Sequence, residues 1–260
     1  MDLGLAGRSA LITGGSRGIG RAIAETLAAA GCHLHLAARS AADLDATQRQ
    51  LATHGVNIVC HPLDLGDSRS IDKLRESCSD IDILVNNAGA IPAGTLGSID
   101  EAAWREAWDL KVFGYINLCR SLYPAMAQRQ RGVILNIVGV AGGEVTEGRY
   151  IAGTTGNAAL VAFTKALGGT SPADNVRVLG INPGLTATDR LVRLMEQNAA
   201  AKGLPAERWR ELTGDLPFGR PAEPSEVADL AAFLVSDRAA YLSGTLVTID
   251  GGLSARGHLF

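Results

Sequence analysis

The apolar positions of the chain gather in short runs that alternate with longer segments of helical periodicity. Most of these runs are apolar throughout, which is typical of strands covered on both faces. Seven of them predict strands: Ser9–Thr13, His33–Ala38, Asn57–Pro62, Ile81–Asn86, Val133–Val138, Val176–Asn182 and Thr245–Ile249. Between the first two, apolar residues recur at helical spacing and a glycine predicts the helix end: Ile19, Ile23, Leu27 and Ala30, then Gly31.

This repeated strand–helix order predicts the fold class. Parallel strands need helical crossovers, and successive right-handed crossovers place helices on both faces of the sheet. We therefore expect a doubly wound α/β protein with a mostly parallel, seven-stranded sheet. Residues 1–260 contain no linker, repeat or low-complexity tract, so they predict a single domain.

One segment, 189–224, interrupts this order. It is long, polar and contains prolines, and it lies between the sixth and seventh predicted strands. An insertion after the carboxyl end of a strand is where a substrate lid would lie, and an ordinary surface excursion is the alternative. Its apolar residues recur at loosely helical spacing and predict one or two short helices: Leu191, Leu194, Met195, Trp209 and Leu212.

Composition and charge exclude several classes of function. The net charge is −3 and the basic residues are scattered, so we expect no nucleic-acid or membrane partner. The N-terminus lacks the pattern of a signal peptide, and the apolar runs are too short to cross a bilayer. The four cysteines (Cys32, Cys60, Cys78 and Cys119) have neither disulfide nor metal-ligand spacing. This spacing predicts reduced thiols, no metal ion and a cytoplasmic location.

A glycine-rich turn joins the first strand to the first helix. Glycines allow the backbone to approach a pyrophosphate, and the helix N-terminus presents free N–H groups to it. The turn reads Thr13-Gly14-Gly15-Ser16-Arg17-Gly18-Ile19-Gly20. Its position between a strand and a helix predicts a dinucleotide site.

The spacing TGxxxGxG resembles the short-chain dehydrogenase/reductase family, and four further motifs follow in the family's order. They are Asp64-Leu65 after the third strand, Asn86-Asn87-Ala88-Gly89 after the fourth, Asn182-Pro183-Gly184 with Thr188, and the closing stretch from Ser225 to Gly252. The resemblance covers nearly the whole chain. It implies a Rossmann fold with strand order 3-2-1-4-5-6-7, a small-molecule substrate, and a homotetramer or homodimer through the long helices after strands four and five.

The resemblance also implies which residues contact the cofactor. These are Gly14, Ser16, Arg17, Gly18, Ile19, Gly20, Arg39, Asp64, Leu65, Asn87, Ala88, Gly89, Pro183, Gly184, Thr186 and Thr188. Ala38 stands where members that prefer NAD usually carry an acid, and Arg39 follows it. An arginine there accommodates a 2′-phosphate, and Arg17 is a second cation nearby. The sequence therefore predicts NADP, with NAD the less favoured cofactor and solvated surface arginines the alternative.

The chain departs from the family's usual catalytic group, which is Asn, Ser, Tyr and Lys. The four matching positions hold Lys111, Gly139, Gly153 and Asn157. The serine hydroxyl and the YxxxK pair are therefore absent, and Lys and Asn have exchanged places.

Tyr150 is the candidate replacement for the missing tyrosine. It lies seven residues before Asn157, a spacing that resembles enoyl reductases of the same superfamily, and would share a helix face with it if the helix reached back that far. Lys111 interrupts an apolar helical stripe, which indicates an inward-facing charge. We expect Tyr150, Lys111 and Asn157 to be the catalytic residues; the alternatives are a Lys111 that extends to solvent and a Tyr150 that packs in a loop.

Two functional hypotheses follow. The first is an NADP-preferring oxidoreductase acting on a small, largely apolar carbonyl, alcohol or conjugated enoyl compound. The second is a catalytically silent NADP-binding protein that acts as a sensor or partner. The absent catalytic group favours the second hypothesis, and the presence of Tyr150 and Lys111 favours the first.

Overall fold

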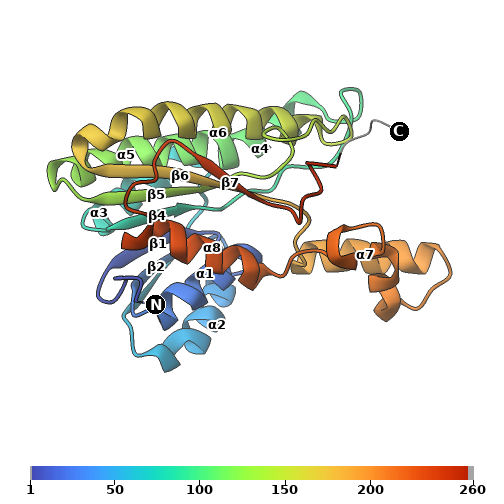
Figure 1. Cartoon of the computed structure of the whole chain (residues 1–260), viewed down its shortest axis with the longest axis horizontal. Helices are drawn as coiled ribbons and strands as arrows, with labels where there is room; N and C mark the ends of the chain where they lie inside the picture. Colours follow the sequence, from blue (N-terminus) through green and yellow to red (C-terminus); the bar gives the residue numbers. More distant parts are fainter. Residues whose placement is uncertain (1, 257–260) are drawn as a thin grey trace.

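Seven strands lie side by side in one parallel sheet in this computed structural model, which describes residues 2–256 (Figure 1). The strand order is β3-β2-β1-β4-β5-β6-β7, as predicted. Every neighbouring pair is parallel, so the sheet is more uniform than the expected mostly parallel one. The strands are β1 (Ser9–Thr13), β2 (His33–Ala38), β3 (Ile58–Pro62), β4 (Ile83–Asn86), β5 (Gly132–Ile137), β6 (Val176–Pro183) and β7 (Leu246–Ile249).

Helices cover both faces of the sheet (Figure 1). One face carries α1 (Gly18–Ala29), α2 (Ala41–Leu51) and α8 (Pro224–Val235), and the other carries α3 (Ser68–Ser77), α4 (Glu101–Trp108), α5 (Gly114–Gln128) and α6 (Ile151–Thr170). The side chains of β1 alternate between the two cores: Ala10 and Ile12 pack toward α1, and Leu11 packs toward α5. Among residues 2–256, no helix is both long and apolar enough to span a bilayer.

The segment 189–224 contains helices, as its spacing predicted. α7 (Asp189–Ala201) and a 3-10 helix (Ala206–Thr213) pack against each other and project beyond the carboxyl ends of the strands (orange in Figure 1). Trp209 is buried in this pair, whereas Leu194 is exposed. The role of the segment as a lid stays a prediction.

Several strand ends differ from the predicted ones by one or two residues. β4 begins at Ile83 instead of Ile81, and the carboxylate of Asp82, just before it, accepts a hydrogen bond from the backbone N–H of Ser9. β5 ends at Ile137 instead of Val138, and β6 extends to Pro183. The carbonyl of Val138 is thus the first one beyond β5.

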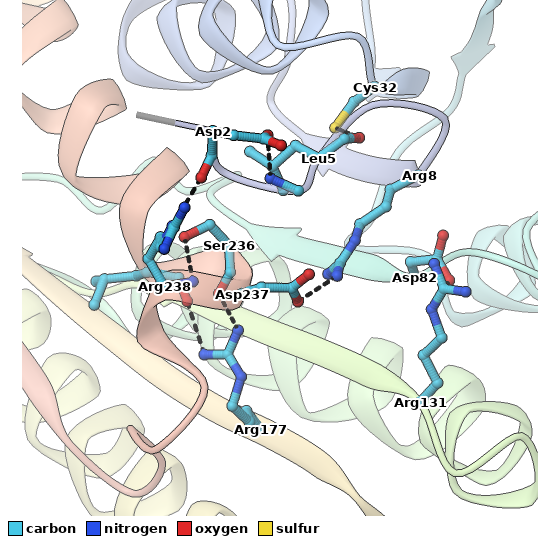
Figure 2. A network of polar contacts seen from close by, with 12 residues as sticks. Asp2, Leu5, Arg8, Cys32, Asp82, Arg131, Arg177, Ser236, Asp237 and Arg238 are labelled. Atoms are coloured by element: carbon cyan, nitrogen blue, oxygen red, sulfur yellow. Dashed lines mark hydrogen bonds and ion pairs between the residues drawn. The ribbon is translucent and has the colours of Figure 1, made fainter.

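A network of arginines joins the amino edge of the sheet to the end of α8 (Figure 2). Arg177 of β6 donates to the backbone carbonyls of Leu234 (2.8 Å) and Ser236 (3.0 Å). Arg8 forms an ion pair with Asp237, and Figure 2 shows the two side chains facing each other. These contacts lie at the opposite edge from the glycine turn, so they hold the scaffold and leave the carboxyl edge open.

We expect Gly168→Ala to destabilise the protein and its neighbour Gly169→Ala to stabilise it. A Cβ at Gly168 would lie 2.4 Å from the backbone nitrogen of Gly244, whereas a Cβ at Gly169 meets nothing within 4 Å. Overpacking costs about 1–3 kcal/mol of unfolding free energy, and alanine gains about 0.5–1 kcal/mol over glycine in a helix. Urea unfolding of the two variants measures this difference, and equal midpoints would contradict the close approach of α6 to the loop before β7.

Candidate active site

The carboxyl ends of β1 and β4 are joined by hydrogen bonds around Thr13. The Thr13 hydroxyl accepts from the backbone nitrogens of Asn87 (2.8 Å) and Ala88 (3.0 Å). The Asn87 side chain donates in turn to the Thr13 carbonyl (2.9 Å). Asn87 therefore fixes the glycine turn relative to β4.

The glycine turn is compact and has no side chains that would keep a bound phosphate away from the backbone. A Cβ on Gly20 would lie 2.3 Å from the carbonyl oxygen of Gly14, so helix α1 starts in contact with the turn. α1 begins at Gly18, and its first N–H groups have no partners within the helix. Gly14 and Gly18 of this glycine cradle face an open cavity, and free N–H groups at the start of a helix fit the pyrophosphate of a dinucleotide.

Two cavities open along the carboxyl edge, with volumes of about 650 Å³ and about 600 Å³. The larger is lined by most of the residues predicted for the cofactor: Gly14, Arg17, Gly18, Ile19, Asn87, Ala88, Gly89, Pro183, Gly184, Thr186 and Thr188. The second is lined by Arg39 and Asp64. Ser16, Gly20 and Leu65 line neither cavity, and Leu65 is part of the core.

The two arginines predicted for the 2′-phosphate have different surroundings. Arg39 is exposed and forms no ion pair with any of residues 2–256. Arg17 forms an ion pair with Asp43 at the start of α2. Hydrogen bonds from Ser40 and Arg17 lower the pKa of the Asp43 carboxyl. Of the two, Arg39 is thus available to bind a 2′-phosphate. Arg17 would first have to break its ion pair with Asp43.

Lys111 lies in a π-helical turn (Asp109–Phe113) between α4 and α5, and a turn of this kind often marks a functional site. Its Nζ donates to the carbonyl oxygen of Val138 (2.6 Å). Lys111 therefore faces the larger cavity and does not extend to solvent. Burial lowers the pKa of its ammonium group to about 8.

Gly139 and Asn157 shape the loop after β5. Gly139 has a φ of +133°, which side chains disfavour, so the position that resembles the family serine has the backbone of a glycine. The Asn157 amide donates to the carbonyl of Ala141 (2.7 Å), and its Oδ1 is buried without a partner among the described residues. A small rotation of the side chain toward the cavity would let a hydroxyl or a water satisfy that oxygen.

Tyr150 lines the cavity from a position that the sequence did not predict. The condition for a shared helix face with Asn157 is not met, because α6 begins at Ile151 and Tyr150 precedes it with φ −137° and ψ 39°. The Tyr150 ring instead folds over Gly153, where a Cβ would lie 1.9 Å from its Cε1 atom. The ring thus occupies the space of the side chain that Gly153 lacks.

Arg190 of α7 is a charged neighbour of Tyr150 that sequence reasoning missed. Burial raises the pKa of the Tyr150 hydroxyl, and the charge of Arg190 partly offsets this shift. Arg190 donates to the carbonyl of Ile91 (3.2 Å) and lines the same cavity. No motif marks it, because it lies in the segment 189–224, which resembles no family pattern.

The fold and the glycine cradle define a dinucleotide-binding α/β protein. A family profile described as short chain dehydrogenase matches residues 8–199, and this chain belongs to that family of oxidoreductases. It is 33% identical to 2-keto-3-deoxy-L-fuconate dehydrogenase of Xanthomonas campestris pv. campestris over 96% of this chain and 81% of that protein. It is 31% identical to the FabG 3-oxoacyl-acyl-carrier-protein reductase of Escherichia coli (95% and 97% covered).

Solved structures are similar along the whole chain. L-sorbose reductase from Gluconobacter frateurii, complexed with NADPH and L-sorbose, superposes with a TM-score of 0.91 at 32% identity, covering 99% of this chain and 100% of that one. Levodione reductase superposes with a TM-score of 0.89 at 26% identity, covering 97% and 99%. The family membership and the Rossmann fold expected from the motifs are therefore confirmed.

We expect the wild type to gain stability relative to Lys111→Met as the pH rises from about 8 to about 10.5. In this window the folded lysine has lost its proton, while the unfolded one, with an ordinary pKa of 10.5, still holds it. The gain is about 1.4 kcal/mol per pH unit for one proton. Urea unfolding at about pH 7.5 and about pH 9.5 measures it, with Lys165→Met, an exposed lysine of α6, as the control. If the difference in unfolding free energy between the wild type and Lys111→Met stayed constant with pH, Lys111 would be solvated.

Proposed function

We propose that the protein is an NADP-preferring oxidoreductase that moves a hydride to or from a small, largely apolar carbonyl, alcohol or conjugated enoyl compound. The observation that carries the proposal is the Tyr150 ring, which lies over Gly153 and faces the same cavity as Lys111 and Asn157. The apolar part of the cavity wall supports the substrate class: it includes Ile137, Val138, Val140, Leu191 and Leu194.

The contacts of each residue indicate its proposed role in the reaction. A bound nicotinamide would supply hydride chemistry, and the protein's own residues would then have to supply or accept one proton. Tyr150 is the proposed proton donor, and the charge of Arg190 beside it favours the ionised form that remains after transfer. Lys111 places a second cation in the cavity. The free Oδ1 of Asn157 would accept from a ribose hydroxyl or a bridging water.

The preference for NADP rests on charge. Arg39 follows Ala38 at the end of β2 and is exposed beside Asp64. An aliphatic residue in place of an acid removes the repulsion that would exclude a 2′-phosphate. The G. frateurii reductase is complexed with NADPH, which supports the same choice here. A dimer or tetramer through α5 and α6, a lid role for 189–224 and a cytoplasmic location remain parts of the proposal.

We expect Arg39→Ala to weaken NADPH binding by about 1.5–3 kcal/mol and to leave NADH binding nearly unchanged, because it removes a charge-assisted contact to the phosphate. Calorimetric titration of both cofactors measures the loss. Arg49→Ala, an exposed arginine of α2, is the matched control and should bind both as the wild type does. A wild type that binds NADH as tightly as NADPH would refute the preference.

We expect Tyr150→Phe and Lys111→Met each to lower kcat about 10²-fold or more while NADPH binding is retained, because each removes a proton-transfer or charged group. The kcat of the double variant should be little lower than that of either single variant, since the two groups act together. Gly153→Ala should also lower kcat, because its Cβ displaces the Tyr150 ring; Gly148→Ala, whose Cβ meets nothing within 4 Å, should not.

The assay follows NADPH oxidation with a panel of ketones and enoyl thioesters. A Tyr150→Phe variant with wild-type kcat would remove Tyr150 from the proton transfer. A wild type that binds NADPH but reduces none of these compounds would favour the silent nucleotide-binding protein.

A further inference from the structure

Three side chains with metal-ligating atoms converge on the face of the sheet that α3 covers. His35 belongs to β2, His61 to the edge strand β3, and Cys78 follows the last residue of α3. His35 Nδ1 lies 3.0 Å from His61 Nε2 and 3.3 Å from Cys78 Sγ, and Sγ lies 3.8 Å from His61 Nε2. All three atoms lie within 4.8 Å of one another.

The backbone explains the convergence of the two histidines. Ala37 is the register partner of His61, and His35 lies two residues before Ala37, so both rings leave the same face of the sheet. The two ring planes are 12° apart and the centroids 5.2 Å apart, so the rings meet edge to edge through the facing nitrogens. Cys78 is fully buried beneath α3, and both histidines are partly exposed. The cluster is therefore built into the fold and still open to solvent on one side.

Hydrogen bonding alone does not satisfy this cluster. Each neutral imidazole nitrogen either donates one proton or accepts one, so the His35–His61 contact uses one N–H and one lone pair. The thiol of Cys78 then competes for the same nitrogens, because its two closest polar contacts are to His35 Nδ1 and His61 Nε2. Neither choice of tautomer gives every group a partner of its own. A cation that accepts an electron pair from each of the three atoms would give every group its own partner.

The spacing of the three atoms matches a zinc site. Zinc binds imidazole nitrogen at roughly 2.0–2.1 Å and thiolate sulfur at roughly 2.3 Å, so tetrahedral angles give N···N of about 3.3 Å and N···S of about 3.6 Å. The observed separations of 3.0, 3.3 and 3.8 Å deviate from these values by less than about 0.4 Å. The two facing nitrogens would turn from each other toward the ion by rotation of the imidazole rings.

The charges around the cluster also suit a cation. Neutral imidazole is the form that ligates metals. The carboxylate of Asp80, two residues after Cys78, lies close enough to act electrostatically on both His35 and Cys78. The same negative charge attracts a divalent ion. None of the three residues lines the two cavities at the carboxyl edge, so this cluster is separate from the candidate active site.

We propose that His35, His61 and Cys78 bind one Zn²⁺ ion, with a water molecule as the fourth ligand. On binding, the S–H bond of Cys78 breaks, its proton goes to solvent, and zinc–sulfur and zinc–nitrogen bonds form without any change of oxidation state. The ion joins β2, the edge strand β3 and the end of α3, so it stabilises the folded protein. Spacing along the sequence could not show this site, because its ligands come from three separate elements.

The test uses the full-length protein after treatment with a chelator and dialysis. Zn²⁺ alone is titrated in competition with a chromophoric chelator, and Co²⁺ alone is added as a spectroscopic probe. We expect one equivalent of Zn²⁺ to bind and to raise Tm, and we expect Co²⁺ to give the near-ultraviolet charge-transfer band of a cobalt–thiolate bond together with the visible bands of tetrahedral cobalt.

Two variants and one control assign the ligands. His61→Gln changes a partly exposed residue of the edge strand and should weaken Zn²⁺ binding about 10–100-fold or more, as loss of an imidazole ligand does. Cys78→Ser should abolish the charge-transfer band, and circular dichroism checks that it folds. Cys60→Ser, from the same strand as His61, should bind like the wild type. Absence of the cobalt–thiolate band in the wild type, or equal Zn²⁺ affinity in wild type and His61→Gln, would overturn the proposal.

Discussion

Helix α1 approaches the end of β1 so closely that no side chain fits between them, and this contact sets the geometry of the carboxyl edge. A Cβ on Gly20 would lie 2.3 Å from the Gly14 carbonyl. Because the turn is this tight, its carbonyls lie where Asn87 can reach them, at 2.9 Å from the Thr13 carbonyl. β4 is thereby fixed to β1, and the two cavities open on either side of this junction.

The sequence predicts what depends on neighbours along the chain. All seven strands follow from local periodicity and the glycine turn from a motif of consecutive residues, whereas the strand order followed from the family resemblance. The contacts of the candidate catalytic residues could not be predicted from the sequence, because they are tertiary contacts. The π-turn at Lys111, the fold of Tyr150 back over Gly153 and the position of Arg190 leave no local pattern. The Arg17–Asp43 ion pair likewise joins residues from two helical segments.

The larger cavity is lined by a cation, Lys111, and a phenol, Tyr150. Lys111 is held by a backbone carbonyl and not by a carboxylate, so its charge is incompletely compensated, and burial lowers its pKa to about 8. Tyr150 has its cation, Arg190, on α7 instead of on its own helix. The electrostatics of the cavity therefore depend on how α7 is placed.

The backbone of Gly139 limits how the site can be redesigned. At φ +133° a serine would be strained, so introducing the hydroxyl that the family resemblance implies there requires a different backbone in the loop after β5. A tyrosine at position 153 would collide with the ring of Tyr150, so Tyr150 would have to be replaced in the same variant. A protein engineer who installs the usual catalytic group would therefore have to change the loop and the start of α6 together.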